Sequence, residues 1–473
     1  MRVNFIAILV SLLYFFYCFI IKEYIFYSSL GLTFSLYIFI DFVNKLGKTF
    51  PIKEFIVLIA ALQWIVGAKI SYSLGKSHHK YFMYVDESTY MSYVVPGIIF
   101  MTLGLFLIRN HLSINLIKNS FSKTSEKSQL TIAYTLIFIG LLSTVLNKII
   151  NVGGIAFILY LASLLLYIGI CYLFFLLPKY KWHLFFITLG ITFIISLDRG
   201  MFHEMLIVTS FFTFLITPKT TSFLTKTFVI FIGTIFIYML QIVKKDFREI
   251  IWNDKNVNSI EVFFNLIEKE FLVEKETETQ PLGVFQQQKE EQKSADANNR
   301  LNQGWIISRV LYNVPDKTPF VNGKTINEAI KASLLPRFLA PEKAGANQGL
   351  VYFREITGLG LSKSASMGLS LIAEFYANYG IVGGWIAMFI YGLLISLIIL
   401  FLINVPGKGS SLMILWLILF FFQVVKAETD FIKIFNHLVK SIIFFMMIML
   451  GLKLIGIDLF KHIAHKDNIN EKI

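Results

Sequence analysis

The chain has 473 residues, of which 56% are hydrophobic and only 15% are charged. Soluble domains carry about 25% charged residues, so this composition excludes a soluble globular protein and predicts a chain that crosses a membrane many times. The net charge is +13, but the excess Lys and Arg lies mainly in short loops between apolar segments. That placement is typical of membrane anchoring and excludes nucleic acid as a partner.

Apolar runs of membrane-spanning length recur along the whole chain. A spanning helix needs about 20 predominantly apolar residues, and twelve runs come near this length. They cover residues 4–21, 24–43, 54–74, 90–108, 130–148, 154–177, 182–197, 200–217, 223–243, 380–404, 411–427 and 434–456. The sequence therefore predicts an all-α polytopic membrane protein with about 12 transmembrane helices.

The short loops between the first nine spans differ in positive charge. With the N-terminus in the cytoplasm, twelve Lys and Arg residues fall in cytoplasmic loops and five in outer loops. Cytoplasmic loops retain positive charge during insertion. We therefore expect a multi-pass protein with both termini in the cytoplasm.

The long polar insertion, residues 244–365, then lies on the outer side and holds 33 of the 73 charged residues. We expect an extracytoplasmic, water-facing lobe between a nine-helix region, residues 1–243, and a C-terminal region, residues 366–473. The first half of the insertion, Asp246–Asn298, is acidic and is expected to be a solvated helix or a disordered connector. The second half, Asn299–Ala365, is basic, and its aromatic residues predict a part that packs and holds its shape.

Five cationic residues of the basic half are candidate ligands for a phosphate group. Guanidinium groups bind phosphate oxygens in pairs and stay charged at any relevant pH. The alternative is that the five are ordinary loop charges paired with nearby acids. Pro336 and Pro341 stiffen the turn around two of them, which favours a binding role. The five residues are Arg300, Arg309, Arg337, Lys343 and Arg354.

Another candidate lies in a tight turn between two apolar spans, in the sequence SLDRGMFHE. Asp198 and Arg199 belong to the turn, and His203 and Glu204 begin the next helix. Ionisable residues this close to the membrane interface usually face a cavity or a partner. Arg199 is therefore either a phosphate ligand in the same cavity as the basic loop or the partner of Asp198 in a surface pair.

One acid stands alone among apolar residues in the sequence SMGLSLIAEFYANYGIVGG. Ser366, Ser370, Glu374 and Asn378 recur every four residues, so they form one polar stripe on a helix. A carboxylate in such surroundings is a candidate proton acceptor. The alternative is an ion pair between Glu374 and one of the arginines.

Three glycines follow this stripe, at Gly380, Gly383 and Gly384. They predict a break before the next span, so residues 366–379 are expected to form a short or re-entrant helix rather than a full crossing.

The remaining charged groups carry weaker signals. No spacing of metal ligands and no P-loop predicts a metal or another cofactor. The charged residues of one further outer turn are expected to pair with one another, and they are Lys426, Glu428, Asp430 and Lys433.

Two of these stretches resemble the Wzy-type oligosaccharide repeat-unit polymerases of bacterial surface-polysaccharide assembly. The resemblance rests on PRFLAPEK at 336–343, on AEFYANYGIVGG at 373–384, on the DRG turn at 198–200 and on many spans with one large late outer loop. It implies a GT-C-like membrane glycosyltransferase of the bacterial cytoplasmic (inner) membrane. Such an enzyme polymerises undecaprenyl-diphosphate-linked repeat units into O-antigen, capsule or exopolysaccharide on the outer face, with no metal or other cofactor.

The resemblance also implies roles for the candidate residues. Glu374 would be the general base for the acceptor hydroxyl or would orient an arginine, and His203 is the outer-side candidate for a ligase-like catalytic His. The implied partners are undecaprenyl-diphosphate-linked glycans and the lipid bilayer, with a chain-length regulator and a flippase as further candidates. The cations that would neutralise the diphosphate leaving group are Arg199, Arg337, Lys343, Arg309, Arg354 and Arg300.

Two other functions fit part of the sequence. An O-antigen-ligase-like transferase would use the same donor with a different acceptor. A lipid-linked-oligosaccharide flippase or transporter would need charged residues through the midplane of many helices. Here charge is concentrated toward the outer surface, which favours an enzyme there.

Overall fold

The computed structural model describes residues 5–75, 82–110, 112–122, 125–150, 153–253, 257–272, 302–335, 348–360, 367–404, 411–454 and 456. Within these ranges the regular structure is helical, and an isolated β-bridge joins Thr49 to Ser113.

The helices of the first half of the chain follow the predicted apolar runs closely. They are α1 (Phe5–Phe16), η1 (Tyr17–Ile21), α2 (Phe26–Lys45), α3 (Ile52–Ala61), η2 (Leu62–Val66), α4 (Gly67–Leu74), α5 (Glu87–Leu107), α6 (Ile114–Ser122), α7 (Glu126–Ile149), α8 (Gly153–Ser163), α9 (Leu165–Leu176), η3 (Pro178–Tyr180), α10 (Lys181–Arg199), α11 (His203–Ile216) and α12 (Phe223–Asn253).

The second half begins with shorter helices of the polar insertion and ends with two long apolar helices. The helices of this half are α13 (Ser259–Ile267), η4 (Glu268–Leu272), α15 (Gly304–Asn313), α16 (Lys324–Leu334), α17 (Gln348–Thr357), α18 (Leu371–Asn404), η5 (Ser411–Trp416), α19 (Leu417–Phe421) and α20 (Phe431–Leu454).

Nine helical stretches of the described chain are long and apolar enough to span a membrane, and they match nine of the twelve predicted spans. Large apolar side chains lie exposed on their outer sides, such as Phe138 of α7 at 66% and Leu224 of α12 at 78%. A large exposed apolar surface of this kind marks a face that meets lipid. The chain is a membrane-embedded helical protein. The other three predicted spans are shorter apolar helices, at Phe5–Ile21, His203–Ile216 and Ser411–Phe421.

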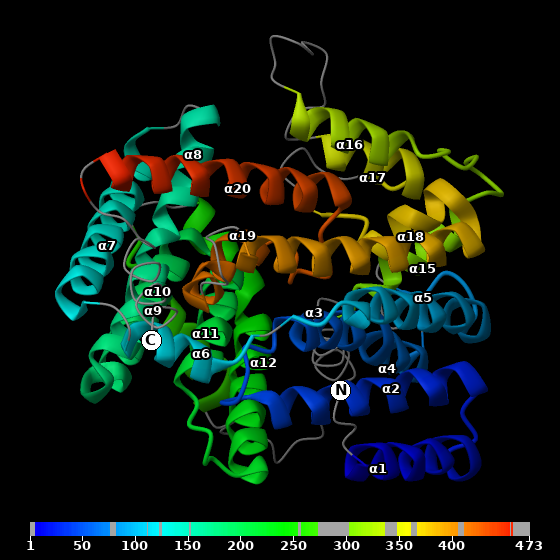
Figure 1. Cartoon of the computed structure of the whole chain (residues 1–473). Helices are drawn as coiled ribbons and strands as arrows, with labels where there is room; N and C mark the ends of the chain where they lie inside the picture. The colour runs from blue at the N-terminus through cyan, green and yellow to red at the C-terminus, as the bar shows by residue number, and fades with distance from the viewer. Residues whose placement is uncertain are drawn as a thin grey trace, which may run out of the picture.

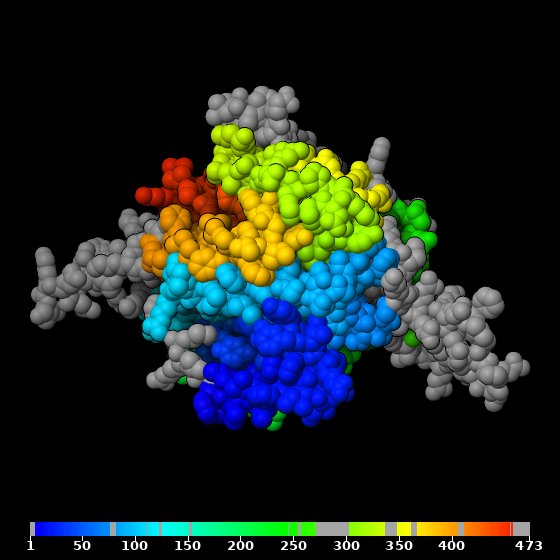
Figure 2. Space-filling view, turned by 90° about the vertical axis from the view of Figure 1, so that its right-hand side faces the viewer, coloured from blue at the N-terminus to red at the C-terminus, as the bar shows by residue number. Residues whose placement is uncertain are grey.

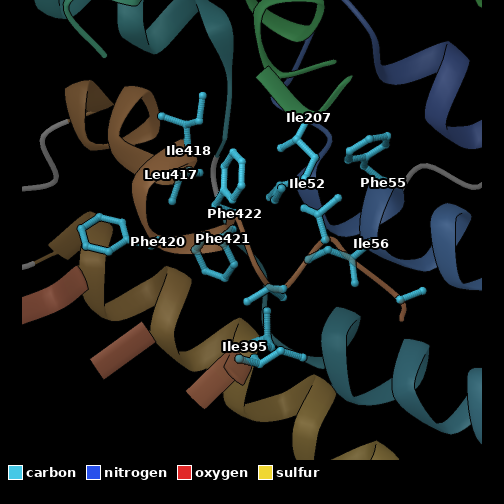
Figure 3. Packing of buried hydrophobic residues seen from close by; sticks show 14 of the residues in the cluster. Ile52, Phe55, Ile56, Ile207, Ile395, Leu417, Ile418, Phe420, Phe421 and Phe422 are labelled. Atoms are coloured by element: carbon cyan, nitrogen blue, oxygen red, sulfur yellow. The ribbon is translucent and has the colours of Figure 1, made fainter. Parts of the chain in front are cut away.

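The last of these short helices lies at the centre of the molecule. Every side chain from Ser411 to Phe422 is buried, and Figure 3 shows Phe421 and Phe422 among side chains of α3, α11 and α18. Protein surrounds this segment, so its 3₁₀ turn and short α-helix need no regular lipid-facing backbone. The prediction of a continuous helix over 411–427 was therefore wrong.

Glycines set the contact between α5 and α18. A Cβ on Gly104 would lie 2.1 Å from the carbonyl oxygen of Phe389, and a Cβ on Gly392 would lie 2.1 Å from that of Met101. Small residues let membrane helices approach this closely. The expected break before the long part of α18 is also present, because Gly380 has a φ of +70° and interrupts the helix. Residues 371–379 therefore form a short helix of their own.

Helices α15, α16 and α17 gather at one end of α5, α18 and α20 (Figure 1), and we call this the lobe end. Figure 2 views the molecule from this side, and the yellow-green residues of this group lie beside the gold surface of α18. The group packs and holds its shape, as its aromatic residues predicted, and it also contacts the membrane-embedded helices. Trp305, Ile306 and Ile307 of α15 are buried, and Asn302 Nδ2 donates to Ser71 Oγ of α4 at 2.7 Å.

The described part of the acidic half is helical, which is the first of the two expected alternatives. Helix α12 continues to Asn253 instead of ending at residue 243. Phe263 of α13 is buried in an apolar cluster with Leu197, Phe202 and Phe247. Most other side chains of this part are exposed or half-buried, so Phe247 and Phe263 anchor an otherwise solvated helical segment.

Candidate functional site

Glu374 lies in the first turn of α18 with 1% of its surface exposed. Its Oε2 accepts a hydrogen bond of 2.7 Å from the backbone N–H of Phe431, the first residue of α20. The first N–H groups of a helix have no partner within it, and the helix dipole favours a negative charge there. Glu374 thus caps α20 from a neighbouring helix. No arginine of the described ranges forms an ion pair with it.

The other described members of the polar stripe are buried beside Glu374. Asn378 Nδ2 donates to Thr325 Oγ1 of α16 at 2.8 Å and to the carbonyl of Glu374 at 2.7 Å. Ser370 precedes α18 with a φ of +64°, and its carbonyl accepts the N–H of Glu374. The stripe is thus a joint between α16, α18 and α20, and Ser366 lies outside the described residues.

The segment before α20 carries the next charged groups. Asp430 is 2% exposed, and Lys433 Nζ lies 2.8 Å from its Oδ2. This ion pair confirms the expected pairing for two of the four residues of the turn. It places a second buried acid one residue before the N–H that Glu374 binds.

Lys426, in the same segment, is oriented differently. Its ammonium lies 4.8 Å from the centroid of the Phe422 ring. Burial lowers the pKa of Lys426 to about 8, against the opposing effects of Glu428 and Glu204. Because Glu204 belongs to α11, Lys426 connects the segment 422–430 electrostatically to the turn that carries Arg199.

Arg199 ends α10 and pairs with Glu204, with 3.1 Å between Nη1 and Oε2. The alternative pair between Asp198 and Arg199 is not formed. Asp198 instead lies 3.5 Å from Lys148 Nζ and accepts a hydrogen bond from Ser259 at 3.1 Å. Arg199 is therefore turned toward α11 rather than toward the exposed side of its turn.

Several positive charges surround the start of α11. Arg248 Nε donates to the carbonyl of Gly200 at 2.7 Å, and four cations lie near enough for their charges to act on the imidazole of His203. Clustered guanidinium and ammonium groups are the usual ligands of phosphate oxygens. We call this group the cationic cluster, and it consists of Arg199, Lys244, Arg248 and Lys426.

The described arginines of the basic half make different contacts. The guanidinium of Arg309 lies 4.6 Å from the ring centroid of Tyr84, and its Nε donates to the carbonyl of Thr357 at 2.8 Å. These contacts hold α15 against α17 and against the segment before α5. Arg354 is half-buried in α17. Arg300, Arg337 and Lys343 lie outside the described residues.

Three members of the cationic cluster were not among the sequence candidates. Lys244 and Arg248 continue α12 past its apolar part, and Lys426 follows an apolar run, so each resembles a charge that anchors a span at the membrane surface. Only the folded chain brings them to the DRG turn. The four-residue spacing of Lys244 and Arg248 was the available signal, because it places both on one face of a helix.

No group of three or more His, Cys, Asp or Glu in the described ranges is arranged to hold a metal ion. Comparison of the chain with family models, with curated proteins and with solved structures gave no match.

Proposed function

We propose that this chain is a GT-C-like oligosaccharide repeat-unit polymerase that joins undecaprenyl-diphosphate-linked units on the outer face of the bacterial cytoplasmic membrane. The motifs at 336–343 and 373–384 and the membrane-embedded fold support the proposal. The cationic cluster is the observation that carries it. Transfer from a diphosphate carrier without a metal needs fixed positive charge where the charge of the leaving group grows.

In this reaction a hydroxyl oxygen of the acceptor unit attacks the anomeric carbon of the donor glycan. The bond from that carbon to the diphosphate breaks, and its electron pair leaves with undecaprenyl diphosphate. Arg199 and Lys426 stabilise the leaving charge, while the pair of Arg199 with Glu204 fixes the guanidinium in place. Arg337 and Lys343, in the basic loop before α17, are further candidates for this role.

The placement of buried charge favours an enzyme over a flippase. In the described ranges the buried Lys, Asp and Glu residues lie within the first four residues of a helix or directly before one. A transporter is expected to carry such groups along the middle of its helices. The buried residues are Lys53, Glu54, Lys226, Glu374 and Asp430.

Deletion of the gene distinguishes the candidate functions. A polymerase mutant is expected to retain single repeat units on its surface glycolipid, whereas a flippase mutant loses lipid-linked units from the outer face. A ligase mutant would make polymer and leave it on the lipid carrier. Complementation with Arg199→Ala and Lys426→Ala should fail to restore polymer, and Lys118→Ala, which alters an exposed lysine, should restore it. Full polymer from both cluster variants would contradict the proposal.

A further inference from the structure

α20 carries a buried histidine that has no role in the reaction as proposed above. His437 is 2% exposed and lies six residues after Phe431, about 9 Å along the helix at 1.5 Å per residue. Its Nε2 lies 2.8 Å from the carbonyl oxygen of Leu419.

The contact with Leu419 fixes which ring nitrogen carries the proton. A carbonyl oxygen only accepts hydrogen bonds, so Nε2 must be the donor. In the neutral ring the lone pair then lies on Nδ1. Nδ1 is buried and has no hydrogen-bond partner among the described residues. The ligand that completes this site must therefore be a donor, which means a hydroxyl group or water.

Aromatic rings hold the imidazole in position. The ring centroids of Phe157 and Tyr160 of α8 lie 6.4 and 6.5 Å from that of His437, both in edge-on arrangements. A base that is oriented by a carbonyl on one nitrogen and presents a lone pair on the other has the geometry of general-base catalysis.

His437 is also linked to the cationic cluster. The ammonium of Lys426 lies 4.8 Å from the Phe422 ring, and the rings of Phe422 and His437 both meet Tyr160 edge-on, at 6.2 and 6.5 Å. A ligand of Lys426 would therefore lie two aromatic rings, Phe422 and Tyr160, away from the imidazole of His437. Glu374, by contrast, is engaged with the N–H of Phe431.

We propose that His437 is the general base that accepts the proton of the acceptor hydroxyl, and that Glu374 is a positioning residue that fixes the start of α20. This rests on the proposed function. In the step, Nδ1 takes the hydroxyl proton as the acceptor oxygen bonds to the anomeric carbon and the diphosphate departs with its electron pair. The proton then leaves His437 for water, which returns the neutral ring for the next transfer.

The test uses the purified full chain in nanodiscs with lipid-linked repeat units from a deletion strain. His437→Gln keeps an N–H that can reach the carbonyl of Leu419 but cannot take a proton. It should lower kcat by about 10²-fold to 10⁴-fold, the usual contribution of a general base, with KM little changed. His183→Gln, the matched control, alters an exposed histidine of α10 and should stay within about threefold of the wild type.

Chemical rescue separates catalysis from packing. Imidazole added to His437→Ala should restore part of the lost rate, which a merely structural role would not allow. If His437→Gln keeps the wild-type rate, or if folded His437→Ala is inactive and imidazole restores nothing, His437 is not the base. If the wild-type protein itself makes no polymer, the proposed function is wrong. That result differs from the two outcomes above, in which the wild type is active and only the role of His437 is rejected.

Discussion

The carboxylate of Glu374 and the backbone N–H of Phe431 form a hydrogen bond of 2.7 Å between residues 57 positions apart in the chain. This bond fixes the start of α20 against the short helix 371–379. Asp430 and Lys426 lie in the segment 422–430, which comes directly before Phe431. Because the bond holds Phe431 in place, Glu374 also fixes where this segment ends. A single buried acid thus connects the motif at 373–384 to the cationic cluster.

Replacing Glu374 tests whether its carboxylate caps the start of α20 or acts as the general base. Glu374→Ala leaves the N–H of Phe431 buried without an acceptor, which should cost about 1–3 kcal/mol of the free energy of unfolding. Glu374→Gln keeps a carbonyl acceptor at the same place, so it should lose less stability and retain most polymer formation. Unfolding in SDS and a polymer gel measure the two effects. Equal loss of activity in folded Gln and Ala variants would instead favour Glu374 as the base.

The contact between α5 and α18 depends on the absence of side chains at its two glycines. Gly104→Ala and Gly392→Ala would each place a Cβ 2.1 Å from a backbone oxygen, so the helices must move apart. We expect a loss of about 1–3 kcal/mol for each variant. Gly190→Ala in α10 is the matched control because no atom lies within 4 Å of its added Cβ. Destabilisation by Gly190→Ala of the same size would contradict this account.

Lys53 ties the start of α3 to the far end of α5 and to α18. Its Nζ donates to the carbonyls of Leu105 and Ile108 at 2.8 and 2.9 Å and to Ser396 Oγ at 2.7 Å. Lys53→Met would leave these buried acceptors without a donor and should cost about 3 kcal/mol. The exposed Lys118→Met should change stability by less than about 0.5 kcal/mol. A Lys53→Met protein as stable as the wild type would show that these bonds contribute little.

The pKa of Lys426, lowered to about 8 by burial, predicts a pH dependence. A lysine is charged below its pKa and neutral above it, so the positive charge at the cluster is lost as pH rises through about 8. kcat/KM, which reports on the free enzyme, should fall over that range. Lys426→Arg should keep its charge and move the fall to higher pH, while Lys426→Met should be weak throughout. An unchanged pH profile in Lys426→Arg would exclude Lys426 as the cause.

The sequence predicted the features that depend on local pattern. Apolar runs located nine candidate spans, and glycine at 380 predicted the break in α18. An apolar run alone could not separate a lipid-facing helix from a segment buried in protein, because both are continuously apolar. Residues 411–427 were misassigned for that reason. The long-range pairings were equally hidden. Nothing near Glu374 in the sequence indicates Phe431, and nothing near Arg199 indicates Lys426.

The central claim, that this chain polymerises lipid-linked repeat units, is tested most directly by a reaction in purified form. Wild-type protein in nanodiscs would receive undecaprenyl-diphosphate-linked units extracted from a deletion strain, and glycan length would be followed on gels. The account predicts a ladder of polymer with one undecaprenyl diphosphate released for each new glycosidic bond, and loss of both products in Arg199→Ala. Folded wild-type protein that leaves the units at their original length, with no undecaprenyl diphosphate released, would contradict it.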